Sequence, residues 1–125
     1  MHTICKQFRF EAAHQLLNHD GQCARPHGHS YRVEVRVKGV PQVSGPKEGM
    51  VIDFSDLKTI WTTFCEPLLD HQDLNVTLAS EVPVTTAENL AAWIHGEFKK
   101  QLPPGVMLDG VRVWETATGW AEYTP

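Results

Sequence analysis

The chain contains little cysteine and no long apolar run, and both absences limit what it can be. Its 125 residues include only three cysteines, Cys5, Cys23 and Cys65. An odd number of cysteines without Cys-x-x-Cys spacing does not fit a disulfide framework, and it indicates free thiols in a reducing cytoplasm. No apolar stretch approaches membrane-spanning length, and the N-terminus starts with a strand-like segment rather than a signal peptide. We therefore expect a cytoplasmic protein with no membrane partner.

Excess basic charge is also missing. Lys and Arg number 11 against 15 Asp and Glu, which gives a net charge of -4 and a pI near 5.9. A protein that binds nucleic acid by electrostatics carries a basic stripe, so we expect no nucleic-acid partner. With 125 residues, 42% of them hydrophobic, the chain has the size and composition of one globular domain spanning residues 1–125.

Histidine, in contrast, is concentrated where strands are expected. His27 and His29 flank Gly28 at the start of an alternating polar and apolar segment, and His14 ends an earlier segment of the same kind. Residues two apart in a strand point to the same face, and all three histidines fall in the apolar phase. Antiparallel pairing of the two segments brings the three imidazoles together. Three neutral nitrogen ligands suit zinc and leave a fourth position open for water or substrate.

The remaining periodicity predicts an α+β domain with the order ββααββ. Four strands are expected, at about residues 3–14, 29–39, 107–116 and 119–124. Two helices between the second and third strands would cover one face of a four-stranded antiparallel sheet. A sheet of this size has exposed edges, which proteins protect or use for pairing. We therefore expect a homo-oligomer whose subunits join edge to edge.

Two helix starts carry capping signals. Asp53, followed by Asp56, precedes the first helix, and Thr85, followed by Glu88, precedes the second. Pro67 predicts that the first helix ends or kinks near residue 66, because proline lacks the N–H that a helix interior needs. The segment between the helices, about 70–83, is expected to be a loop.

Other polar residues leave several interpretations open. Cys23 precedes His27 by four residues and suits a fourth metal ligand, a catalytic thiol or an idle one. Asp70 and His71 form either a solvated pair or a proton-transfer dyad. Glu115 shares its phase with apolar neighbours, and it suits an ion pair or the bidentate binding of a guanidine-like edge such as that of a pterin.

Six segments together, in the right order, resemble the family of 6-pyruvoyltetrahydropterin and 6-carboxytetrahydropterin synthases. They cover nearly the whole chain: residues 8–14, 23–29, 49–58, 69–75, 85–91 and 113–116. The resemblance implies that His14, His27 and His29 hold one Zn²⁺ per subunit. It assigns proton transfer to Cys23, Asp70 and His71. It implies pterin contacts by Glu115, Thr86 and Glu88.

The resemblance also implies a fold and an assembly. The family has the tunnelling fold (T-fold), in which subunits join their sheets into a barrel and trimers stack into a hexamer. A trimer, or a hexamer built as a dimer of trimers, is therefore expected, with active sites between subunits. Arg25 would either contact a triphosphate or product carboxylate or simply lie on the surface.

The spacing Cys-x3-His-Gly-His resembles the 6-carboxytetrahydropterin synthases of queuosine and other 7-deazapurine pathways. This implies a zinc-dependent lyase that converts 7,8-dihydroneopterin triphosphate to 6-carboxy-5,6,7,8-tetrahydropterin, acetaldehyde and triphosphate. The alternative is a 6-pyruvoyltetrahydropterin synthase, which eliminates triphosphate from the same substrate. A more remote alternative is a non-catalytic zinc-binding scaffold domain, with four protein ligands and no affinity for pterins.

Overall fold

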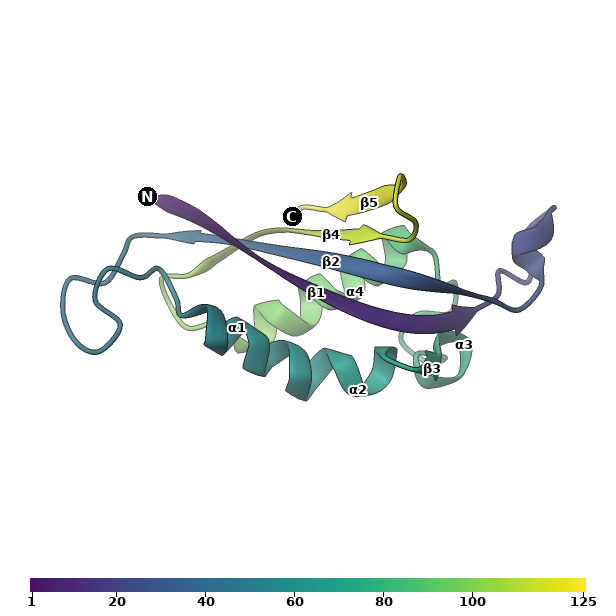
Figure 1. Ribbon diagram of the computed structural model, residues 1–125, viewed down its shortest axis with the longest axis horizontal. Coiled ribbons are helices and arrows are strands. Elements are labelled where there is room, and N and C mark those ends of the chain that lie inside the picture. Colours follow the sequence, from purple (N-terminus) through teal and green to yellow (C-terminus); the bar gives the residue numbers. More distant parts are fainter.

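The computed structural model describes residues 1–125, and its centre is a five-stranded sheet with the order β3-β1-β2-β4-β5. The strands are β1 (His2–His14), β2 (His27–Gly39), β3 (Gln72–Asp73), β4 (Met107–Trp114) and β5 (Trp120–Tyr123). The helices are η1 (Gln22–Ala24), α1 (Phe54–Ile60), η2 (Trp61–Cys65), α2 (Glu66–Leu69), α3 (Leu74–Thr77) and α4 (Ala87–Gln101). Figure 1 shows the longer helices below one face of the sheet. None of the helices has the length and apolar character needed to cross a bilayer.

The hairpin of β1 and β2 is the longest feature of the sheet. Each strand has 13 residues, and they pair antiparallel from His2 opposite Gly39 to His14 opposite His27. Alternate residues of both strands are buried against the helices, which confirms the expected phase. Strand β2 begins two residues earlier than predicted, so His27 lies inside the hairpin rather than in the loop before it.

The prediction of a four-stranded, purely antiparallel sheet is wrong by one short strand. β3 pairs parallel with β1, with Gln72 opposite Ala12 and Asp73 opposite Ala13. The helix α3 follows directly, so part of the segment 70–83, which was expected to be a loop, forms a short strand and a short helix. A strand of two residues and a helix of four have too few positions to show a period, which is why the alternation of side chains did not predict them. The α+β class and one covered face are confirmed.

The first helix continues past Pro67. A π-helical turn, η2, comes immediately before α2, and Pro67 occupies the first turn of α2. A first-turn position tolerates proline, because its missing N–H would have no partner there. The prediction was an end or a kink near residue 66: the chain stays helical to Leu69, so the helix does not end there, but its regular geometry is interrupted by the π-helical turn that finishes at Cys65.

One capping prediction is confirmed and the other is shifted by one residue. Asp53 caps α1 and accepts a hydrogen bond from the backbone N–H of Ser55 (2.8 Å). The α4 cap is Thr86, whose hydroxyl accepts a hydrogen bond from the N–H of Asn89 (3.2 Å). Thr85 is fully buried instead. The shift places Thr85 against the end of β1.

Candidate metal centre and active site

The three histidines converge at the end of the β1–β2 hairpin. His14 and His27 are register partners across the two strands, and His29 is two residues further along β2. Their ring centroids are 4.6 Å (His14–His27), 4.8 Å (His27–His29) and 5.1 Å (His14–His29) apart. One nitrogen of each ring lies within 4.8 Å of the corresponding nitrogens of the other two. The group could therefore hold a metal ion.

Backbone carbonyls fix the orientation of two of these rings. Nδ1 of His14 lies 2.8 Å from the carbonyl oxygen of Thr85, and Nδ1 of His27 lies 2.7 Å from that of Arg25. A carbonyl can only accept, so each Nδ1 carries the proton and each Nε2 keeps its lone pair. Nε2 of His14, His27 and His29 is buried in each case and has no hydrogen-bond partner. Buried polar atoms without partners are rare, and three aimed at one point fit a bound cation.

The surroundings favour the neutral form of the ligands. Burial lowers the pKa of His14 and is the largest influence on it, ahead of the Thr85 hydrogen bond that raises it. Burial also lowers the pKa of His29, while the nearby Glu115 carboxylate acts in the opposite direction. An imidazole binds metal only when neutral, so these shifts extend metal binding to lower pH.

Glu115 lies beside this cluster at the end of β4. Its Oε1 is 3.5 Å from Nε2 of His29, and its side chain is partly exposed. The carboxylate therefore borders the cluster and is still open to solvent on one side. Thr86 contributes its hydroxyl to the α4 cap, one residue after the Thr85 carbonyl that orients His14. Glu88 is exposed in the first turn of the same helix.

A second group forms where α2 meets β1. Asp70 accepts a hydrogen bond from the backbone N–H of Glu11 at Oδ1 (3.0 Å), and its Oδ2 lies 3.0 Å from Nδ1 of His71. The backbone N–H of His71 donates to the carbonyl oxygen of Glu11 (2.6 Å). The Glu11 hydrogen bond is the main reason that the pKa of Asp70 lies below its ordinary value. Asp70 is thus an ionised carboxylate that orients the His71 ring.

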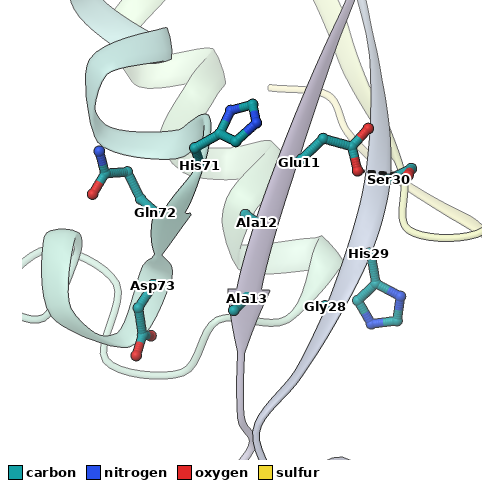
Figure 2. Close-up of a pocket in the computed structure, with 9 residues that line it drawn as sticks. All are labelled: Glu11, Ala12, Ala13, Gly28, His29, Ser30, His71, Gln72 and Asp73. Carbon is teal, nitrogen blue, oxygen red and sulfur yellow. Dashed lines mark hydrogen bonds between the residues drawn. The ribbon is translucent and has the colours of Figure 1, made fainter.

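His71 has an unusual backbone conformation, and its imidazole ring is exposed to solvent. Its φ is 57°, and it is the single non-glycine residue with a positive φ. Such a conformation persists when surrounding contacts hold it, here the two Glu11 hydrogen bonds. Its side chain is 79% exposed. Figure 2 shows the His71 ring beside β1, with Glu11 on β1 and Ser30 on the neighbouring strand β2. An open pocket of about 570 Å³ connects His71 with His29.

Within one chain, His71 and His29 line the same open pocket, but no hydrogen bond or ion pair joins the Asp70–His71 group to the histidine cluster. His14 points to the helix-covered face of β1, whereas Glu11 lies on the opposite face. Three residues separate them, which corresponds to about 10 Å along a strand. Cys23 lies in η1, in the loop that extends beyond the hairpin (Figure 1), and its thiol is free and half-buried. It is not part of the metal-binding group.

Two residues of these sites were not predicted from the sequence. Thr85 orients His14 through its backbone carbonyl, which any residue type provides, so no side-chain signal marks it. Glu11 joins Asp70 and His71 to β1 through its own backbone. In the sequence, Glu11 is marked only by lying in residues 8–14, one of the six segments that resemble the synthase family. Arg25 likewise acts through its carbonyl oxygen, and its exposed side chain has no ion pair within 4 Å.

Comparisons with known proteins agree on one family. The family model described as 6-pyruvoyl tetrahydropterin synthase matches residues 3–125. The 6-carboxy-5,6,7,8-tetrahydropterin synthase of Synechocystis sp. is 44% identical over 124 residues, covering 98% of this chain and 93% of that protein. The enzyme of the same name from Haemophilus influenzae is 36% identical over 141 residues, which cover 98% of this chain and 99% of that protein. The solved structure of Caenorhabditis elegans 6-pyruvoyl tetrahydropterin synthase superposes with a TM-score of 0.83 at 27% identity, covering 98% and 94%.

Proposed function

The chain belongs to the 6-pyruvoyl tetrahydropterin synthase family, and from this premise we propose that it is a zinc-dependent 6-carboxy-5,6,7,8-tetrahydropterin synthase. Its substrates are 7,8-dihydroneopterin triphosphate and one water molecule, which supplies the additional oxygen of the products, and the co-products are acetaldehyde and triphosphate. The relatives with this name at 44% and 36% identity support the product, as does the short Cys-x3-His-Gly-His spacing. The observation that carries the proposal is the histidine cluster with three unpartnered Nε2 atoms. Residues 1–125 act as one domain.

His14, His27 and His29 bind one Zn²⁺ per subunit through Nε2. Three nitrogen ligands are the set of a catalytic rather than a closed structural zinc site. When bound, zinc supplies a Lewis acid that stabilises negative charge developing on the side-chain oxygens of the substrate. The Thr85 and Arg25 carbonyls support this binding, because they hold the Nδ1 proton and direct Nε2 of two of the histidines to the shared point.

Proton transfer is assigned to Cys23, Asp70 and His71. Because Nδ1 of His71 faces Asp70, its Nε2 is left to exchange a proton with the substrate. Asp70 keeps the ring in one tautomer, and Cys23 serves the opposite side of the reacting carbon chain. Glu115 anchors the pterin through the N–H groups of its guanidine-like edge, and Thr86 and Glu88 line the same pocket.

We further propose a homo-oligomer, a trimer or a hexamer made of two trimers, with sheets joined into a barrel. Two observations support this arrangement. His71 is largely exposed and the Cys23 loop extends beyond the hairpin, which leaves both accessible to a neighbouring subunit. Strand β1 also has an open edge, because β3 pairs only with Ala12 and Ala13. A neighbouring subunit at such an edge would complete both the sheet and the site.

The test is to incubate the zinc-loaded protein with 7,8-dihydroneopterin triphosphate and to identify the products by mass spectrometry. We expect 6-carboxy-5,6,7,8-tetrahydropterin with an equal amount of acetaldehyde. Triphosphate release without acetaldehyde would instead indicate the 6-pyruvoyltetrahydropterin reaction. Absence of both products, together with no affinity for pterins, would support the non-catalytic scaffold.

A further inference from the structure

Four arginines lie on the outer face of the sheet, opposite the helices, and they differ in how their charges are balanced. Arg36 and Arg112 share one carboxylate, since Nη1 of Arg36 lies 2.6 Å and Nε of Arg112 3.1 Å from Oε1 of Glu122. Nε of Arg36 is also 3.6 Å from Oδ2 of Asp109, so these two arginines are paired with two carboxylates of the chain. Arg9 and Arg32, nearer the active-site end, are not.

Arg9 and Arg32 are register partners on β1 and β2. Like charges directly opposite each other on neighbouring strands destabilise a sheet. Arg9 has no ion pair within 4 Å, and the only one of Arg32 is a 4.0 Å contact with Glu34. Nε of Arg32 is buried without a hydrogen-bond partner. Oε1 of Glu34 already accepts from the indole N–H of Trp114 (3.0 Å). The chain therefore places two facing cations whose only ion pair is the long Arg32–Glu34 contact, and that carboxylate is already hydrogen-bonded to Trp114.

These two arginines line a pocket of about 320 Å³ that also contains the hydroxyls of Ser30 and Thr116. The guanidinium of Arg32 stacks on Trp114, 4.4 Å from the ring centroid, which restricts its movement. Glu11 is the one carboxylate in the lining, and it accepts a hydrogen bond from Ser30 (2.6 Å). The lining thus contains two cations and a single acid, and that acid already has a hydrogen-bond partner.

The same pocket adjoins the one that contains His71 and His29. Glu11 and Ser30 line both, so the two pockets form one continuous depression across β1 and β2. A ligand that reaches the proposed catalytic residues can therefore extend toward the arginines. Two residues along a strand cover about 7 Å, so Arg9 lies one short step beyond Glu11.

We propose that Arg9 and Arg32 bind a polyphosphate group, which is the triphosphate of the substrate if the function proposed above is correct. Guanidinium forks bind phosphate oxygens in pairs and keep their charge at any physiological pH. A polyanion between the two side chains replaces their mutual repulsion with two attractive contacts.

The direct test is calorimetric titration of the zinc-loaded protein with inorganic tripolyphosphate at low ionic strength. Arg9→Gln and Arg32→Gln should each weaken binding by about tenfold or more, as expected for loss of a charge-assisted contact. The matched control, Arg112→Gln, removes the same charge from an arginine that is already paired, and its affinity should stay at the wild-type value. Tripolyphosphate can also extract zinc from the protein, and this contribution to the measured heat should be the same for the wild type and all variants.

A second readout separates binding from damage to the fold. Without tripolyphosphate, Arg9→Gln should melt at the same temperature as the wild type or higher, because a like-charge pair is lost. With the same concentration of tripolyphosphate, the wild type should gain more thermal stability than Arg9→Gln. Equal affinity of wild type and Arg9→Gln, or an equal loss in Arg112→Gln, would overturn the site.

Kinetics with 7,8-dihydroneopterin triphosphate identify the source of the polyphosphate. We expect Arg9→Gln to raise KM by about tenfold with little change in kcat, as loss of uniform binding does. Weaker tripolyphosphate binding with an unchanged KM would overturn the assignment to the substrate. If the wild type converts no substrate, the proposed function fails, and the tripolyphosphate titration still decides the anion site.

Discussion

The histidine cluster and the Asp70–His71 group are built to different degrees within one chain. The cluster is set on two long, paired strands, and His14 is 2% exposed. Backbone carbonyls fix two of its three rings. His71, in contrast, is 79% exposed and sits at the edge of the sheet in a left-handed backbone conformation. Cys23 lies in a loop that extends away from the sheet (Figure 1).

The difference indicates which part of the chemistry needs assembly. A metal site whose ligands share one hairpin can form before any second subunit arrives. The residues proposed for proton transfer are positioned by the backbone of the monomer, but none of them belongs to the histidine cluster. We therefore expect changes to the histidines to affect metal content, and changes to Cys23, Asp70 or His71 to affect turnover without loss of metal.

The largest effect is expected from His29→Ala. Partners that only orient metal ligands are worth about 10–100-fold in affinity, so loss of a ligand should lower zinc affinity by more than about 100-fold. Turnover should fall with the metal content. Zinc per subunit, measured by atomic emission after dialysis, checks this, and His19→Ala, outside the cluster, is the control. Full zinc occupancy in His29→Ala would contradict the assignment.

Cys23→Ala tests the other side of the comparison. We expect zinc content equal to wild type and a loss of turnover of about 10²–10⁴-fold, the range for general acid–base catalysis. Cys5→Ala, which removes an exposed free thiol elsewhere, is the matched control. A parallel fall in zinc content would identify Cys23 as a ligand, and the site would then be closed and structural.

Asp70→Asn should also leave zinc in place while lowering kcat by about 100-fold, because the ring of His71 loses its charged partner.

The same substitution should change the pH dependence of stability. The pKa of Asp70 is below its ordinary value of 3.8, so its contribution is present above that value and is lost as pH falls toward the lower, folded-state pKa. The wild type should therefore lose part of its stability below about pH 4. Melting temperatures of both proteins between neutral and acidic pH check this, and identical acid profiles would contradict it.

The smallest effect concerns the backbone of His71. Glycine adopts a positive φ at no steric cost, whereas alanine pays about 1 kcal/mol or more there. His71→Gly should therefore be more stable than His71→Ala by about 1 kcal/mol, measured by urea unfolding of both variants. Equal stabilities would mean that the left-handed conformation is not retained.

The histidine cluster could be predicted because its signal is periodic. His14, His27 and His29 share a phase with buried residues of long strands, and pairing of those strands brings them together at one end. The same reasoning gave the α+β class and the covered face. It placed the start of β2 at about residue 29, two residues later than in the structure, although it had already put His27 in the phase of the strand.

The features that the sequence did not predict depend on backbone groups or on very short secondary-structure elements. The Thr85 carbonyl that orients His14 and the Glu11 backbone that holds Asp70 carry no side-chain signature. The two-residue strand β3 has no period to detect, yet it positions His71 beside β1. The facing pair Arg9 and Arg32 became visible only with the strand register, since residues 23 apart have no local relation.

The most direct test of the account is X-ray absorption spectroscopy of the zinc-loaded protein at the zinc edge. We predict one zinc per subunit with three imidazole nitrogens at about 2.0–2.1 Å and a light-atom fourth ligand. A sulfur ligand at about 2.3 Å would close the open position and contradict the proposed catalytic role.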